Sequence, residues 1–217
     1  MRASLASQNV VIAANVLNPS LFTPNWLVRH GIVAEDDILP GIIVTDALAQ
    51  VPTSRFSLLV LPQQLQFIPP SDAAVPDLLE SALGRLIDLV PHTPFLAVGL
   101  NFHWHLDAGG EPMTAASRRL FGRADAPVYR HFADADAQFG AYLSRDVAHG
   151  ARLKLDIKPA LLRDAEGNNV HRLLFAFNFH KAVGGDNAAG LVREILAGWA
   201  EFDSLARTIL ADLGEAE

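Results

Sequence analysis

The chain has 217 residues, of which 50% are apolar and 19% are charged, and it carries a formal net charge of −7 and no cysteine. Intrinsic disorder is excluded because it requires lower hydrophobicity and higher charge, and the negative charge disfavours nucleic acid as a partner. Without cysteine the chain has no disulfide, no thiol nucleophile and no zinc site built on thiolates. His and carboxylate side chains are therefore the candidate metal ligands.

The N-terminal segment, MRASLASQNVVIAANVL, contains one arginine and a short apolar run that Asn15 interrupts. A signal peptide would need a longer apolar core, and no run approaches the roughly 18 apolar residues of a membrane span. We therefore expect a cytoplasmic protein without membrane contact. The mean hydropathy of +0.21 is high for a soluble monomer, so we expect a homodimer in which surplus apolar surface is covered.

The first part of the chain shows strand patterns with one short helix. Residues 9–17 are rich in β-formers, and Thr23 precedes a proline as the N-cap of a helix. The apolar segments 41–51 and 55–68 are joined by three residues, which predicts antiparallel neighbours. Pro62 has no amide proton to donate, so we expect the second of these strands at a sheet edge or bulged there.

A long helix and a long strand follow. Apolar residues recur at helical spacing over 76–90, and the next apolar segment, 95–107, has the pattern of a strand. The pattern then weakens over 109–135, where Gly109 and Pro112 mark a break, and we interpret this stretch as a linker or excursion.

The last part predicts a hairpin followed by a helix. Residues 137–148 have a weak strand pattern, and 151–163 alternate strictly between apolar and charged side chains. A polar turn leads back into 170–180, which is typical of a β-hairpin. The stripe of apolar residues over 188–213 predicts a long amphipathic helix that packs on a sheet face.

These elements predict an α+β fold with a largely antiparallel, curved sheet packed by two long helices, at about 76–90 and 188–213. We expect a first β/α half at 1–108, the excursion at 109–135, and a second half at 136–217, together forming one compact domain. Each half carries antiparallel strands, one long helix and one Asn-Phe-His triplet. A duplication is therefore one hypothesis for the origin of the two halves, although their element order differs.

The triplet Asn-Phe-His ends two apolar strand segments, at 101–103 and at 178–180. Because side chains alternate along a strand, Phe102 and Phe179 lie on one face while the Asn and His side chains lie on the other. The simplest interpretation is pleat geometry, with aromatic rings toward the core. Small residues before the first triplet, such as Gly99, would let a helix pack closely over the polar face.

The polar residues of these strands are also candidates for a functional site. Asn101, His103, His105, Asn178 and His180 could line a polar pocket in which an imidazole acts as a general base near neutral pH. His103 and His105 share a strand face at about 6 to 7 Å, which suits a shared divalent metal. His180 would be the third ligand of this site if the two strands are neighbours, and Asp107 is the alternative.

Other motifs give little further information about the function. The chain contains no nucleophile elbow, phosphate-binding loop or dinucleotide fingerprint, and a serine hydrolase is disfavoured. The stretch Gln63–Gln66 carries amides that pair well along sheets, and on an edge strand it would form the dimer interface.

Two functions remain as hypotheses. The first is a non-enzymatic binding or assembly module, which presents a sheet surface to a protein or a small-molecule ligand. The alternative is a His-based enzyme, with or without a divalent metal, whose site lies on the Asn-Phe-His strands. The first is favoured because the sequence shows no dense cluster of polar residues of the kind that forms catalytic sites.

Overall fold

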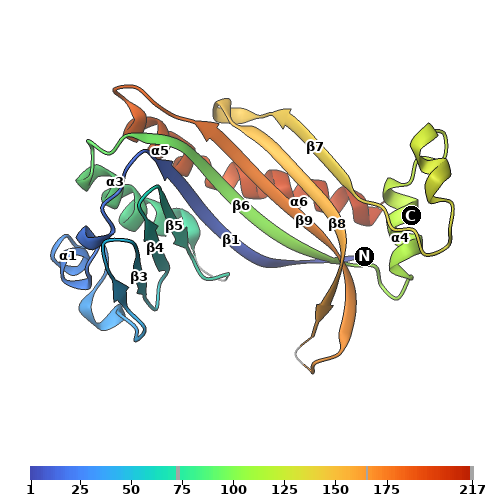
Figure 1. The fold of residues 1–217 in the computed structure, drawn as a ribbon, viewed down its shortest axis with the longest axis horizontal. Coiled ribbons are helices and arrows are strands. Elements are labelled where there is room, and N and C mark those ends of the chain that lie inside the picture. Colours follow the sequence, from blue (N-terminus) through green and yellow to red (C-terminus); the bar gives the residue numbers. More distant parts are fainter. Residues whose placement is uncertain (72–73, 165, 216–217) are drawn as a thin grey trace.

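The computed structural model describes residues 1–71, 74–164 and 166–215. They form one nine-stranded antiparallel sheet in the order β2-β3-β4-β5-β1-β6-β9-β8-β7 (Figure 1). The strands are β1 (Arg2–Ala14), β2 (Ile43–Val44), β3 (Ala49–Pro52), β4 (Ser57–Leu61), β5 (Gln64–Ile68), β6 (Phe95–Asp107), β7 (Ala141–Asp146), β8 (Arg152–Arg163) and β9 (Asn169–Ala182).

Helices cover one face of this sheet. They are α1 (Pro24–Arg29), α2 (Val75–Leu78), α3 (Arg85–Leu89), α4 (Met113–Phe121), α5 (Ala188–Ala197) and α6 (Trp199–Glu215), with a π-helical segment, η3 (Leu79–Gly84), between α2 and α3. Figure 1 shows α5 and α6 on the far side of the long strands. The predicted α+β fold with a curved antiparallel sheet is confirmed. None of the helices in the described part of the chain is long and apolar enough to cross a membrane.

The two predicted long helices are each subdivided. The first is formed by α2, η3 and α3 in succession, and the second breaks at Gly198 between α5 and α6. A Cβ atom at Gly198 would lie 3.0 Å from both the Phe202 ring and the His149 ring. Glycine at the break therefore allows His149 to approach the helix junction closely, and His149 Nε2 lies 2.9 Å from a carboxylate oxygen of Glu201.

The core lies between the helices and the aromatic face of the long strands. Phe102 and Phe179 are both completely buried, as their alternation predicted. The Phe102 ring lies 4.5 Å from that of Trp199, and the Phe179 ring lies 4.7 Å from that of Phe202. Phe102 and Phe179 thus each meet an aromatic side chain of α6, and these contacts help to hold this helix on the sheet.

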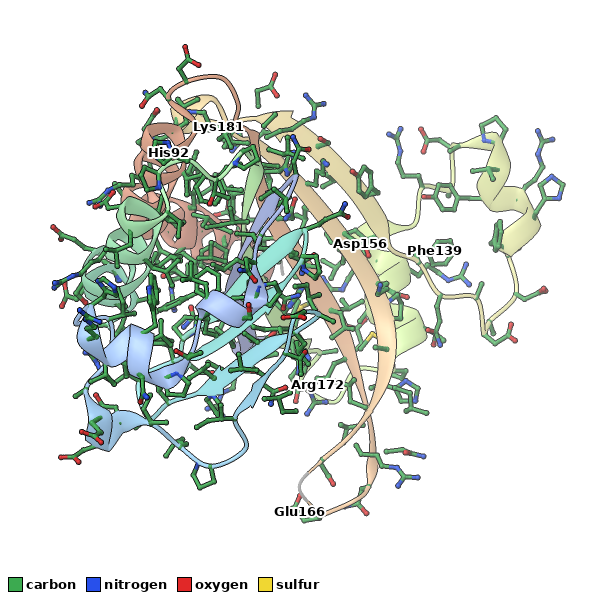
Figure 2. All side chains as sticks on the ribbon, turned by 60° about the vertical axis from the view of Figure 1, so that its left-hand side comes forward. His92, Phe139, Asp156, Glu166, Arg172 and Lys181 are labelled. Carbon is green, nitrogen blue, oxygen red and sulfur yellow. The ribbon has the colours of Figure 1, made fainter. Side chains whose placement is uncertain are left out.

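The excursion after β6 is tied back to the sheet. The buried Ser117 of α4 accepts a hydrogen bond of 3.2 Å from the Phe139 amide, and the Arg118 guanidinium stacks over the Phe139 ring at 5.0 Å. Figure 2 shows Phe139 close to this helix, just before β7 begins. The segment predicted as a linker therefore contains α4 and leads directly into the outermost strand.

The predicted edge position of Gln63–Gln66 is wrong. Pro62 and Gln63 form a two-residue turn between β4 and β5, so the segment 55–68 is a hairpin and not one bulged strand. In β5, Gln66 pairs with Leu59 on one side and with Val11 on the other. A proline in the turn costs no ladder hydrogen bond, and β5 is an interior strand that has no free edge for a second subunit.

Candidate functional site

The two Asn-Phe-His strands are antiparallel neighbours. β6 pairs with β9 in a register that sets Asn101 opposite Asn178 and Phe102 opposite Phe177. Because cross-strand partners point to the same side of a sheet, the amides of both triplets lie together on one face. This face is opposite the one that packs on α5 and α6, and it holds the candidate site.

Three asparagines on adjacent strands form a hydrogen-bonded row, which we call the asparagine ladder. Nδ2 of Asn101 donates to Oδ1 of Asn9 at 2.7 Å, and Nδ2 of Asn178 donates to Oδ1 of Asn101 at 2.6 Å. A Cβ atom at Gly99 would lie 3.0 Å from Nδ2 of Asn178. The glycine thus leaves room for an amide side chain. The described atoms nearest to that position belong to Asn178, Asn101 and Val11, which all lie in strands, so the expectation that a helix packs closely at Gly99 is wrong.

Asn9 also belongs to the site, although it was not among the residues selected from the sequence. It lies in β1, which pairs with β6 and sets Asn9 directly opposite Asn101. The available signal was an amide inside a strongly apolar strand segment, where a polar side chain needs a hydrogen-bond partner. Only the pairing of β1 with β6 identifies that partner.

The histidines flank the ladder. His103 follows Asn101 on β6 with the Ser7 hydroxyl 3.0 Å from its Nδ1, and His180 lies on the other side, opposite Gly99. Partial burial among neighbouring side chains is the main cause that lowers the pKa of all three imidazoles of the predicted site. Lys158 adds to this effect for His103, and Lys154 does so for His180. For His105 the further causes are Arg172 and then His103.

The register separates His180 from the other two histidines. His103 lies opposite Ala176, four residues from His180 along β9, which corresponds to about 13 Å in an extended strand. Asp107, the alternative third ligand, forms an ion pair of 2.9 Å with Arg172. Across residues 1–71, 74–164 and 166–215, no group of three or more His, Asp or Glu side chains is arranged to hold a metal ion.

The contact between Ser7 and His103 is the arrangement closest to a catalytic pair. A serine nucleophile needs its imidazole partner oriented by a third group and a set of donors for the developing oxyanion. Within the described part of the chain, no hydrogen bond joins His103 to a carboxylate. The pair also lies on the surface of a sheet and is exposed. Among the described residues, His103 therefore has no third group that would orient its imidazole toward Ser7.

Positive charge borders the ladder. Lys154 of β8 lies opposite Asn178 on the same face. Lys158 is paired with Asp156 at 3.2 Å, whereas Lys154 forms no ion pair with any described residue. We define the polar sheet face by Asn9, Asn101, Asn178, His103, His105, His180 and Lys154. Figure 2 shows Asp156 and Arg172 on β8 and β9, whose hairpin continues to Glu166 at its tip.

Comparison with known proteins gave no match. No family model, curated protein or solved structure matches the chain. Its function is therefore proposed from the residues and geometry of the polar sheet face.

We expect the protein to lose stability as the pH falls below the ordinary histidine range. His103, His105 and His180 have lowered pKa values in the folded chain. Below a pH of about 6.5 the unfolded chain therefore binds protons that the folded chain does not bind, and unfolding becomes more favourable. This contribution to stability is complete above that pH and is lost as the pH falls toward the folded-state values.

Urea unfolding at a series of pH values measures this decline. In a variant with glutamine at the three positions, the free energy of unfolding should decline less steeply with falling pH than in the wild type. At alkaline pH the two proteins should differ only by a constant amount. An unchanged slope in this variant would show that other groups control the acid response.

Proposed function

We propose that this protein is a non-enzymatic binding protein whose polar sheet face takes an acidic polypeptide segment in an extended conformation. The observation that carries the proposal is the asparagine ladder, bordered by three imidazoles that each have a basic neighbour. The contacts of α6 fall on the opposite, aromatic face of the sheet, so they do not cover this surface.

The ladder has unused hydrogen-bonding groups at both ends. Nδ2 of Asn9 and Oδ1 of Asn178 form no hydrogen bond with a described residue, so one end offers donors and the other an acceptor. The three side chains follow the spacing of adjacent strands, about 4.8 Å, across the sheet. A peptide crossing the strands can therefore pair its backbone groups with the two ends while its side chains contact the flanking residues.

The charge of this face differs from that of the whole chain. The chain carries a net charge of −7, yet the charged neighbours that shift the imidazoles are Lys154, Lys158 and Arg172. Lys158 is paired with Asp156 and Arg172 with Asp107, whereas Lys154 forms no ion pair with a described residue. Lys154 is therefore the cation of this face that would attract a carboxylate of the partner. An acidic segment would also raise the pKa of the imidazoles, so binding should take up protons.

The test is a titration of the protein into a fluorescent, glutamate-rich peptide, followed by anisotropy. We expect saturable binding that tightens as the pH falls from neutral, because His103 and His180 then become cationic beside the peptide carboxylates. Replacing Lys154 with glutamine should weaken binding about tenfold, which corresponds to the loss of one charge-assisted hydrogen bond. Replacing Asn178 with leucine should weaken it as well.

Arg85 is a matched control because it is an exposed cation on α3, on the helix side of the molecule. Arg85→Gln removes the same charge as Lys154→Gln and should leave the affinity unchanged. A neutral peptide of the same length and a single-stranded oligonucleotide complete the comparison. Equal weakening by both variants, or tighter binding of the oligonucleotide, would contradict the proposal.

A further inference from the structure

The outermost strand β7 has one unpaired edge. It is the last strand of the sheet and pairs only with β8, in an unbroken register from Ala141 opposite Ile157 to Asp146 opposite Arg152. In Figure 1, β7 lies along the outer margin of the sheet. Its outward backbone N–H and C=O groups form no hydrogen bond with described residues. Such a row of groups is a template for another strand.

Edges are usually protected by proline, by charged side chains, by a bulge or by being very short. β7 carries its two charges, Arg145 and Asp146, at its C-terminal end, and its first four residues have none of these features. β7 has the sequence AYLSRD and no bulge, and it exposes 66% of Tyr142 and 55% of Leu143. At the other margin of the sheet, β2 is only two residues long. Of the two outermost strands, β7 is therefore the longer, and its exposed Tyr142 and Leu143 leave its middle accessible to a second strand.

We infer that β7 pairs with β7 of a second copy of this chain, so that the two sheets become continuous across a twofold axis. The strand that pairs with β7 is a second copy of β7, because two copies of this strand can pair with each other in antiparallel orientation. A twofold axis perpendicular to the sheet makes the paired strands antiparallel and keeps the same face of both sheets on one side. Residues of one face then meet only residues of that face.

The exposed Leu143 determines the register in which the two copies of β7 pair. With the axis at Leu143, this leucine meets its own copy on the helix side of the sheet, Tyr142 lies opposite Ser144, and Arg145 lies opposite Ala141. The exposed leucines then cover each other. Arg145 and Asp146 of one copy lie at the opposite end of the strand pair from Arg145 and Asp146 of the other copy. Like charges therefore do not face each other. This interface is independent of the proposed peptide-binding function, because it uses only the strand edge.

The first test is the mass of the protein in solution over a range of concentrations, by analytical ultracentrifugation. The pairing of six-residue strands forms a small interface, so we expect a concentration-dependent change from 23.4 kDa to twice that mass. Leu143→Lys places two ammonium groups against each other at the axis and should keep the chain monomeric. Leu161→Lys is the matched control, because Leu161 is equally exposed, at 56%, and lies on β8.

The second test uses the absence of cysteine from the chain. Leu143→Cys should form a disulfide-linked dimer under mild oxidation, because directly opposite residues of antiparallel strands have the Cα separation that a disulfide requires. Leu161→Cys measures the rate of crosslinking by random collision. A wild type that remains monomeric up to its solubility limit, a dimer that persists in Leu143→Lys, or equal crosslinking of the two cysteine variants would each overturn the inference.

Discussion

Replacing Phe102 with alanine should lower the free energy of unfolding by about 4 kcal/mol. Phe102 is completely buried, and its ring contacts those of Phe179 and Trp199 at centroid distances of 5.8 and 4.5 Å. Both neighbours belong to elements that other contacts hold in place, so the space cannot close by a small movement. The expected loss combines the transfer free energy of the ring with the cost of the cavity that remains.

Chemical denaturation followed by circular dichroism measures this loss. Phe132→Ala is the matched control, because 49% of Phe132 is exposed and its removal should change the stability by less than about 0.5 kcal/mol. Similar losses in the two variants would contradict the assignment of Phe102 to the core between sheet and helices.

Replacing Gly140 with alanine should destabilise the protein by about 1 to 3 kcal/mol through steric overlap. Gly140 directly precedes β7, and a Cβ atom there would lie 2.2 Å from the backbone oxygen of Ile157 on β8. Backbone of a paired strand cannot move away as a flexible side chain can. The first residues of β7 should therefore separate from β8, and hydrogen exchange of the amides from Ala141 onward should become faster.

Gly184→Ala is the control for this substitution. Apart from its chain neighbours, no described residue has a heavy atom within 4 Å of a Cβ atom added at Gly184. The stability of the Gly184→Ala variant should therefore be unchanged or slightly increased. Wild-type stability of Gly140→Ala, together with wild-type protection of the β7 amides from hydrogen exchange, would contradict the close approach of Gly140 to the Ile157 backbone. The same variant should also weaken the dimer, because it displaces the strand that forms the interface.

Local pattern was sufficient for several elements and for the direction of side chains along the long strands. The strand predicted at 95–107 has these bounds in the structure, and the Thr23 hydroxyl accepts a hydrogen bond from the Trp26 amide as the predicted N-cap. Both features depend on residues a few positions apart in the chain. The subdivision of 41–51 and 55–68 into shorter strands was missed, because apolar runs alone do not mark the short turns at 45–48 and 62–63.

The candidate site could be predicted only in part. The sequence placed Asn101, His103 and His105 on one face and Asn178 and His180 on another, but it could not show whether these faces adjoin. The structure makes them neighbours, adds Asn9 from β1, and offsets His180 by four residues from His103. Strand order and register depend on contacts between residues up to about a hundred positions apart, which no local pattern encodes.

By itself, the sequence determined that aromatic side chains of the Asn-Phe-His strands point to the core and amides to the other side, because the pleat alternates with a period of two residues. The tertiary structure alone decided which strands are adjacent, that β5 is interior, and that β7 is left with an unpaired edge. Those features follow from how all strands and helices together bury their apolar faces, and this packing fixes the asparagine ladder across β1, β6 and β9.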